Sequence, residues 1–479
     1  MEYWIGFQGL YSRFLGWLMR RVPNEQQRLL GVTVLAGGLC GLSAVAFHVS
    51  ISWLEALFIH RANAAPGYWW IGLTILCPGL GGLVVGLGLT YFAPAAAGSG
   101  IPQVKVAYTL RNGLITVRET VGKFVLCALQ LGSGASLGLE GPTVQICAGV
   151  SSILARVARL SPKNCRRMAS VGMAAGIAAA FNAPIAAVTF TLEELIGDLD
   201  QTMLSGVIVA AALAAVVEHS ILGNRPIFHV QRAYTLTNAS SLIGYAVLGL
   251  LAAIVSVTFT DSLLRLRARF RRLTAVPRWV HPAIGGLAVG CLAAGSLALF
   301  HLNGIAGDPY QTLTLALTGS IGILPVGAMA GFCVIKLAAT VCSYSSGGSG
   351  GIFAPALFMG AMLGGSIGYL DMIVFHHPAD TVGAFAVVGM GAVFAGIVRA
   401  PMTSILIVFE MTGGYGLVLP LMIANMSAFV LARYWRNVPI YEALLAQDGI
   451  HLPHGNEPLD PTEDSQLPES ELPIDDATA

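Results

Sequence analysis

Long apolar stretches recur along the chain and constrain its fold more than any other feature. Four of them contain no Asp, Glu, Lys or Arg, and they cover residues 29–54, 69–89, 242–257 and 283–300. An α-helix needs about 20 mostly apolar residues to cross the hydrocarbon core of a bilayer. Charged residues make up only 11% of the 479 residues, against about 25% in soluble domains. The sequence therefore predicts an all-α polytopic membrane protein.

The charged residues that remain predict how the chain is oriented. Basic residues gather in three segments, 13–28, 156–167 and 265–278, which the positive-inside rule places on the cytoplasmic face. Segment 1–26 mixes aromatic and leucine residues with arginines, and this pattern predicts an amphipathic helix on the membrane surface. Segment 448–479 is acidic and proline-rich and lacks Lys and Arg, a composition typical of disordered tails. Both termini are expected in the cytoplasm.

One internal match joins two distant segments of the chain. Residues 171–195 resemble residues 388–412 at an offset of 217, and both segments contain VGM, an Ala-Pro pair and a glutamate. The two glutamates are Glu193 and Glu410, so a structural role common to both repeats is expected for them. Glu194, which follows Glu193, has no acidic counterpart in the second segment and fits a role needed once per subunit.

A second match supports the internal repeat. Residues 132–142 align with residues 345–355 at an offset of 213, with shared glycine, serine and proline positions. We therefore expect two homologous halves, 27–220 and 239–447. Membrane transporters are often built in this way, with the substrate site where interrupted helices of the two halves meet.

Three glycine-rich motifs each precede an apolar helical segment: GSGIP at 98–102, GLEGP at 138–142 and GGIFAP at 350–355. The glycines allow the backbone to turn, and each proline suits the first turn of a helix. A helix start leaves backbone N–H groups without partners and carries roughly half a positive charge. Several such starts that converge would bind an anion, and weak binding at several sites suits conduction. Glu140 is the only charged residue within 129–150, and an intramembrane carboxylate usually serves function.

These motifs, in this order, resemble the CLC family of chloride channels and proton-coupled chloride transporters. The segments AAFNAP (179–184), LEE (192–194) and PIY (439–441) extend the resemblance, which covers about 27–445. It implies a homodimer with one anion pathway per subunit, inverted repeats, and broken and re-entrant helices. A prokaryotic plasma membrane is the expected location, since no large C-terminal regulatory domain follows.

The resemblance also implies roles for single residues in the anion site. Ser99 and Tyr441 would supply hydroxyl groups to a central anion, and the backbone N–H groups of Ile352 and Phe353 would complete the site. Lys123 falls where the family often has a buried lysine. For Tyr441 the alternative is an ordinary interfacial aromatic residue, and for Ser99 it is a simple helix cap.

The two candidate proton-handling groups are glutamates. By the resemblance, Glu140 is the gating glutamate that exchanges protons, and Glu194 is the internal proton acceptor. Their alternatives are a structural helix cap and a solvated residue at a helix end, respectively. The chain departs from the usual GREGP pattern, because Leu139 stands where arginine is common. A positive charge beside the outer gate is therefore missing.

The sequence favours a secondary transporter that exchanges chloride for protons. A passive gated chloride channel on the same fold is the alternative. An intramembrane enzyme is disfavoured, because no HExxH, GxSxG or paired-Asp motif lies in the apolar segments. We expect no cofactor, no metal site and no nucleic-acid partner, and the expected partners are chloride, protons, the lipid bilayer and a second copy of the chain.

Overall fold

The computed structural model describes residues 24–196, 201–223, 234, 240–307 and 309–452. Nearly all of the expected surface helix at 1–26 and of the acidic tail at 448–479 lies outside these residues. The described part is built from helices, and its only β-type pairings are two isolated bridges. Nine of its helical segments are long and apolar enough to cross a membrane.

The helices fall into an N-terminal set and a C-terminal set. The N-terminal set consists of α2 (Glu25–Glu55), α3 (Arg61–Asn63), α4 (Trp69–Tyr91), α5 (Ile101–Leu110), α6 (Val117–Gly132), α7 (Glu140–Val157), α8 (Pro162–Phe181), α9 (Pro184–Thr191) and α10 (Gln201–Leu222). The C-terminal set consists of α11 (Ser241–Arg272), α12 (His281–Phe300), α13 (Tyr310–Leu317), α14 (Val326–Ser345), α15 (Phe353–Phe375), α16 (Asp380–Val398), α17 (Pro401–Thr412), α18 (Val418–Trp435) and α19 (Ile440–Gln447). Short π- and 3-10 segments complete the described part: η1 (Ala56–His60), η2 (Pro94–Ala96), η3 (Leu192–Ile196), η4 (Arg278–Val280) and η5 (Tyr415–Leu417).

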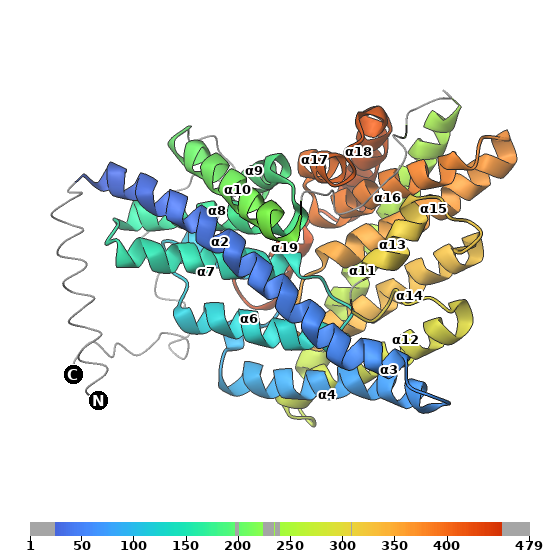
Figure 1. Ribbon diagram of the computed structural model, residues 1–479, viewed down its shortest axis with the longest axis horizontal. Coiled ribbons are helices and arrows are strands. Elements are labelled where there is room, and N and C mark those ends of the chain that lie inside the picture. Colours follow the sequence, from blue (N-terminus) through green and yellow to red (C-terminus); the bar gives the residue numbers. More distant parts are fainter. Residues whose placement is uncertain (1–23, 197–200, 224–233, 235–239, 308, 453–479) are drawn as a thin grey trace.

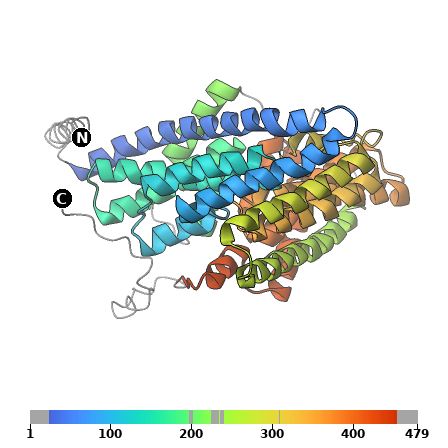
Figure 2. The same ribbon diagram turned by 90° about the horizontal axis from the view of Figure 1, so that it is seen from below.

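The two sets lie side by side. Figure 1 shows most of the N-terminal set, coloured blue to green, on one side of the molecule and most of the C-terminal set, coloured yellow to red, on the other. Figure 2 shows the same division after a turn of 90°. Each of the four apolar stretches identified in the sequence lies within one long helix, namely α2, α4, α11 or α12. The all-α, polytopic prediction is therefore confirmed.

Glycines bring helices α4 and α12 of the two sets into close contact. A Cβ atom added at Gly82 would lie 2.2 Å from the carbonyl oxygen of Pro282, and one added at Gly286 would lie 2.1 Å from that of Pro78. No side chain fits at either position. Small residues of this kind let helix backbones pack closely in membranes, where there is little hydrophobic force between helices.

Two helices of the expected repeats are interrupted at Ala-Pro pairs, one in each set. Helix α8 ends at Phe181, and Asn182 takes a left-handed conformation with φ 51° before α9 begins at Pro184. Helix α16 ends at Val398, and Arg399 has φ 71° before α17 begins at Pro401. Proline fits the first turn of a new helix but cannot donate the hydrogen bond that would continue the old one. Both breaks fall at the Ala-Pro pairs that the two matched segments share.

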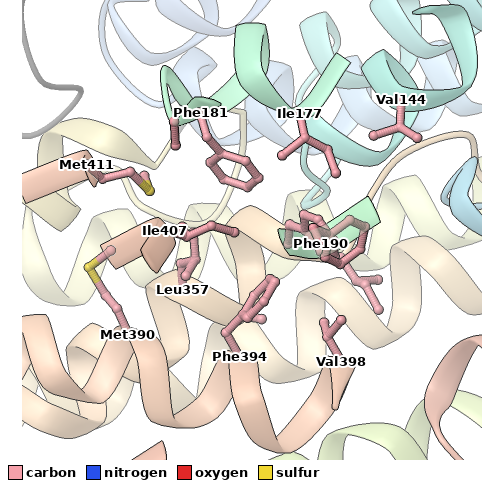
Figure 3. Close-up of a cluster of buried hydrophobic side chains, with 14 of the residues drawn as sticks. Val144, Ile177, Phe181, Phe190, Leu357, Met390, Phe394, Val398, Ile407 and Met411 are labelled. Atoms are coloured by element: carbon pink, nitrogen blue, oxygen red, sulfur yellow. The ribbon is translucent and has the colours of Figure 1, made fainter. Parts of the chain in front are cut away.

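The broken helices enclose an apolar core between the two sets. Figure 3 shows Phe181 and Phe190, from α8 and α9, facing Leu357 of α15 and Phe394 of α16. Helix α16 is the most enclosed of the candidate membrane spans, since 94% of its most apolar 18-residue stretch is buried inside the molecule. Phe353, the first residue of α15, is buried in this core. The core therefore fixes the position of the α15 N-terminus.

Candidate anion site and proton-exchanging groups

Backbone hydrogen bonds join the three glycine-rich motifs. The Gly98 N–H donates to Gly348 O and the Gly350 N–H donates to Gly98 O, both at 3.0 Å. Gly138 and Gly351 exchange two further N–H···O bonds, of 2.8 and 2.6 Å. The motifs lie up to 252 residues apart in the chain, yet the two bridges hold their backbones side by side.

Each joined motif leads directly into a helix. Helix α5 begins at Ile101, α7 at Glu140 and α15 at Phe353, so three helix N-termini start from one place. Each start carries roughly half a positive charge and points N–H groups at whatever lies in front of it. The arrangement is suited to an anion.

Glu140 lies at this place with its side chain fully buried. The Tyr310 hydroxyl donates to Glu140 Oε1 at 3.0 Å, and the Ala354 N–H of α15 donates to Oε2 at 3.3 Å. A carboxylate thus binds the first turn of α15, next to the backbone of Ile352 and Phe353. The start of α15 thus binds a negative charge of the protein itself, at the position where an external anion is expected.

Steric crowding explains why the residues near Glu140 at positions 138 and 141 are glycines. A Cβ atom at Gly138 would lie 2.3 Å from Glu140 Oε2, and one at Gly141 would lie 2.4 Å from Ser99 O. A side chain at position 138 would therefore displace the carboxylate from α15. A side chain at position 141 would push away the loop that carries Ser99.

Ser99 and Tyr441 each bury a hydroxyl group near the helix starts. Both residues have no exposed surface, and neither the Ser99 Oγ atom nor the Tyr441 hydroxyl has a hydrogen-bond partner among the described residues. Burying a hydroxyl group without a partner costs roughly 1–3 kcal/mol by protein mutational data. Hydroxyl groups of this kind are suited to donate to a bound anion, the role that the resemblance implies for them.

Aromatic rings surround the start of α15. The Phe353 ring lies 5.9 Å from that of Phe181, 5.4 Å from that of Phe190 and 4.9 Å from that of Phe394, between ring centroids. The Tyr441 ring lies 6.4 Å from it. These contacts fix the first residue of α15 against both broken helices and bring the Tyr441 ring close to the α15 start. An apolar surround also keeps water away and strengthens the field of the helix start.

Two buried lysines each bind backbone carbonyls of a segment that precedes a helix. Lys123 Nζ donates to Ala96 O at 3.0 Å and Gly98 O at 2.6 Å, which holds the chain immediately before Ser99. Lys336 Nζ donates to Gly304 O at 3.0 Å and to the next carbonyl at 3.2 Å. Each ammonium group binds backbone carbonyls. Lys336 follows Lys123 by 213 residues, the offset of the second internal match, so the repeat itself is the signal that would have predicted it.

Glu194 lies apart from Glu140, in the π-helical segment η3 that follows α9. Its Oε1 forms a 2.8 Å ion pair with Lys105 of α5, whose ammonium also lies 3.9 Å from Glu442 Oε1. Glu442 follows Tyr441 in α19, and the Tyr441 ring lies near that of Phe353 at the start of α15. Helix α19 thus lies close to both the Lys105–Glu194 ion pair and the start of α15.

Sequence reasoning missed Tyr310 and Lys105, the polar partners of Glu140 and Glu194. Tyr310 opens a short helix that no motif marks, and Lys105 is six residues after Ser99 in an ordinary helical pattern. Neither has a local signal, because each partner comes from a distant segment. Among the described residues, no group of three or more His, Cys, Asp or Glu side chains is arranged to hold a metal ion.

The starts of α5, α7 and α15 converge on the buried Glu140 carboxylate, in a helical protein with nine candidate membrane spans among its described residues. These features place the chain in the class of polytopic membrane proteins built around an intramembrane ion site. The family model for the voltage gated chloride channel matches residues 81–433. The chain belongs to this family, the CLC family.

Relatives and solved structures agree with this assignment. The chain is 33% identical over 448 residues to the H⁺/Cl⁻ exchange transporter ClcA of Salmonella arizonae, a match that covers 90% of this chain and 92% of the relative. It is also similar to the crystal structure of a slow cyanobacterial Cl⁻/H⁺ antiporter, with TM-score 0.79, 26% identity, and coverage of 88% of this chain and 98% of that one. A eukaryotic CLC transporter has the same fold, with TM-score 0.73, 22% identity, and coverage of 88% and 74%.

Proposed function

We propose that the protein is a secondary transporter that exchanges chloride for protons across a membrane. One observation carries the proposal: the Glu140 carboxylate is bound to the Ala354 N–H in the first turn of α15. A titratable anion thus takes the position that is suited to a chloride ion, and proton binding and chloride binding compete. The relatives named as H⁺/Cl⁻ exchangers support the same reading.

Competition at α15 gives a mechanism. With Glu140 ionised, its carboxylate closes the anion path. Protonation removes the negative charge, so the attraction to the helix start is lost and the side chain can leave. A chloride ion then binds the α15 backbone N–H groups, with the buried hydroxyl groups of Ser99 and Tyr441 as further donors. Return of the carboxylate expels the chloride and releases the proton.

Protons must also reach Glu140 from the inner side, through apolar surroundings. We assign this step to Glu194, which is paired with Lys105 at 2.8 Å and has a side chain that is 9% exposed. The ion pair holds the carboxylate in place at the edge of the buried region. A passive channel needs no such group.

Assembly and orientation form part of the proposal. We propose a homodimer in a prokaryotic plasma membrane, with both termini in the cytoplasm and with two inverted repeats at 27–220 and 239–447. The matched helix breaks of α8–α9 and α16–α17 support the repeats. Helix α2 already begins at Glu25, so the boundary of the first repeat falls inside its first turn.

The decisive experiment is to record chloride and pH together. Purified protein is reconstituted in liposomes loaded with high chloride, and an outward chloride gradient is imposed with valinomycin and potassium present to set the voltage. An exchanger drives protons into the liposomes against their gradient as chloride leaves. Chloride efflux with no opposed proton movement would establish the channel alternative instead.

A further inference from the structure

Two adjoining cavities lie in front of Glu140. The first has about 20 Å³ and is lined by Glu140 and Glu55. The second has about 220 Å³ and is lined by Glu218 and Thr143. A water molecule needs about 10–15 Å³ of such volume, so the second cavity has room for several.

The two cavities share part of their walls. His48, Leu139 and Tyr310 line both of them. Tyr310 is also the residue whose hydroxyl donates to Glu140. His48 and Tyr310 are therefore the titratable side chains that the cavity at Glu140 shares with the second cavity.

Glu218 is the acid of the second cavity. It belongs to α10, and its Oε2 atom is buried without a hydrogen-bond partner among the described residues. Helix α10 begins at Gln201, shortly after Glu194 in the chain. At 1.5 Å per residue, Glu218 lies about 25 Å along the helix axis from Gln201. Glu218 therefore lies near the end of α10 that is farther from Gln201.

The ionisable side chains around the second cavity are suited to proton transfer. Its titratable side chains are Glu218 from α10, His48 from α2 and Tyr310 from α13, while Glu140 and Glu55 face the adjoining cavity. Helices α7 and α8 contribute no ionisable group to the second cavity, and no described lysine or arginine lines either one. Leu139 faces the cavities in the place of the arginine that is common in the family, so no fixed cation repels a proton there.

We propose that Glu218 is a further proton-exchanging residue, on the outer side of Glu140. The inference rests on the proposed function and names its external proton route. The O–H bond of protonated Glu140 breaks, water and the His48 imidazole pass the proton on, and an O–H bond forms on the Glu218 carboxylate. Release from Glu218 to the outer solution completes the step, and uptake is its reverse.

The test is the pH profile of exchange in liposomes, with equal pH on both sides from 5 to 8. A positioned acid or base contributes about 10²- to 10⁴-fold to the rate of a proton-transfer step. Glu218 exchanges protons with Glu140 only through other groups, so we expect a smaller effect: Glu218→Gln slows exchange about tenfold at pH 8. At pH 5 abundant protons reach Glu140 through water, so the variant approaches the parent rate. His48→Gln shifts the profile in the same direction, and Glu218→Asp preserves the parent profile.

Two controls separate proton transfer from packing. His219→Gln changes the neighbouring titratable residue of α10, which lines neither cavity, and leaves the profile unchanged. In a Glu140→Gln background, where chloride crosses without proton exchange, adding Glu218→Gln causes no further loss of chloride flux. An unchanged profile in Glu218→Gln, or an equal loss at every pH, overturns this inference. If the parent moves no protons at all, the proposed function fails instead.

Discussion

Glu193 and Glu410 form reciprocal helix caps across the two halves of the molecule: Glu193 caps α17, the helix that contains Glu410, and Glu410 caps α9, the helix directly before Glu193. Glu193 accepts the N–H groups of Met402 and Thr403, at 3.1 and 2.9 Å, at the start of α17. Glu410 accepts those of Ile185 and Ala186, at 3.0 and 2.7 Å, at the start of α9. Reciprocal contacts of this kind arise between units that are related by a twofold axis. They support the internal repeat with geometry that is independent of the sequence match.

The first prediction concerns the stability contributed by these caps. Alanine in place of Glu193 or Glu410 leaves two backbone N–H groups at a helix start without their acceptor, and Glu193→Ala also removes the acceptor of the Thr403 hydroxyl. Loss of such a cap costs about 0.5–2 kcal/mol, so we expect comparable falls in the free energy of unfolding for both variants. Thermal unfolding of the purified protein in detergent measures this.

Two further variants serve as controls for the caps. Glutamine at either position keeps one oxygen acceptor and should destabilise less than alanine. Thr189→Val, which removes a hydroxyl bonded only to carbonyls of its own helix, should have little effect. A large loss for one glutamate and none for the other would show that the two caps are not equivalent.

The sequence predicted the parts of the fold that depend on local patterns. Apolar length predicted the long helices, and both helix breaks fall at Ala-Pro pairs that the internal match had aligned. The glycine-rich motifs predicted helix starts at 101, 140 and 353, because glycine turns and early prolines act within a few residues. The side-by-side position of those motifs followed only from the resemblance, and the structure shows it as backbone bonds between Gly98 and Gly350 and between Gly138 and Gly351.

Polar partners could not be predicted in the same way. Tyr310 reaches Glu140 across 170 residues, and Lys105 reaches Glu194 across 89. Whether two side chains meet over such separations depends on how whole helices pack, which no local spacing encodes. Glu218 was missed for the same reason. Within α10 its position is that of an ordinary residue near a helix end, and the cavity forms only because α2, α7 and α8 pack around it.

The second prediction is that Glu140→Gln abolishes proton transport and retains some chloride movement. The amide has the shape of the protonated side chain but can neither shuttle a proton nor compete as an anion for α15. Parallel recordings of chloride and pH in liposomes measure both fluxes. If the variant pumped protons as well as the parent does, Glu140 would not be the exchanging group.

The third prediction is that Ser99 tunes anion preference. Its buried Oγ atom is suited to donate one hydrogen bond to a compact ion, and in the family that this sequence resembles, proline at this position accompanies nitrate preference. Ser99→Pro should therefore raise nitrate transport relative to chloride. Flux ratios in the two anions provide the measurement. Ser133→Ala, which removes a buried hydroxyl that donates to Gln130 O at the end of α6, provides a control. An unchanged ratio in Ser99→Pro would count against Ser99 in the anion site.

The fourth prediction separates exchanger from channel at Glu194. Glu194→Gln should leave chloride flux measurable while chloride-driven proton uptake disappears, because the anion path needs only Glu140 as its gate. The matched variant Glu193→Gln changes the neighbouring carboxylate, which caps α17 and has no assigned role in proton transfer, so it should retain coupled uptake. Equal coupling in the parent and in Glu194→Gln would move the internal proton acceptor elsewhere.

The last prediction concerns the hydroxyl group that holds Glu140 in the closed position. Tyr310→Phe removes the donor to Glu140 Oε1 and keeps the ring. A hydrogen bond to a charged group is worth about 1.5–3 kcal/mol, and every 1.4 kcal/mol changes an equilibrium tenfold. The carboxylate then competes less well for α15, so chloride should bind roughly 10- to 100-fold more tightly by isothermal titration calorimetry. In a Glu140→Gln background no carboxylate competes, and the same substitution should leave chloride affinity unchanged. An equal gain in both backgrounds would show that Tyr310 acts on the chloride ion directly and not through Glu140.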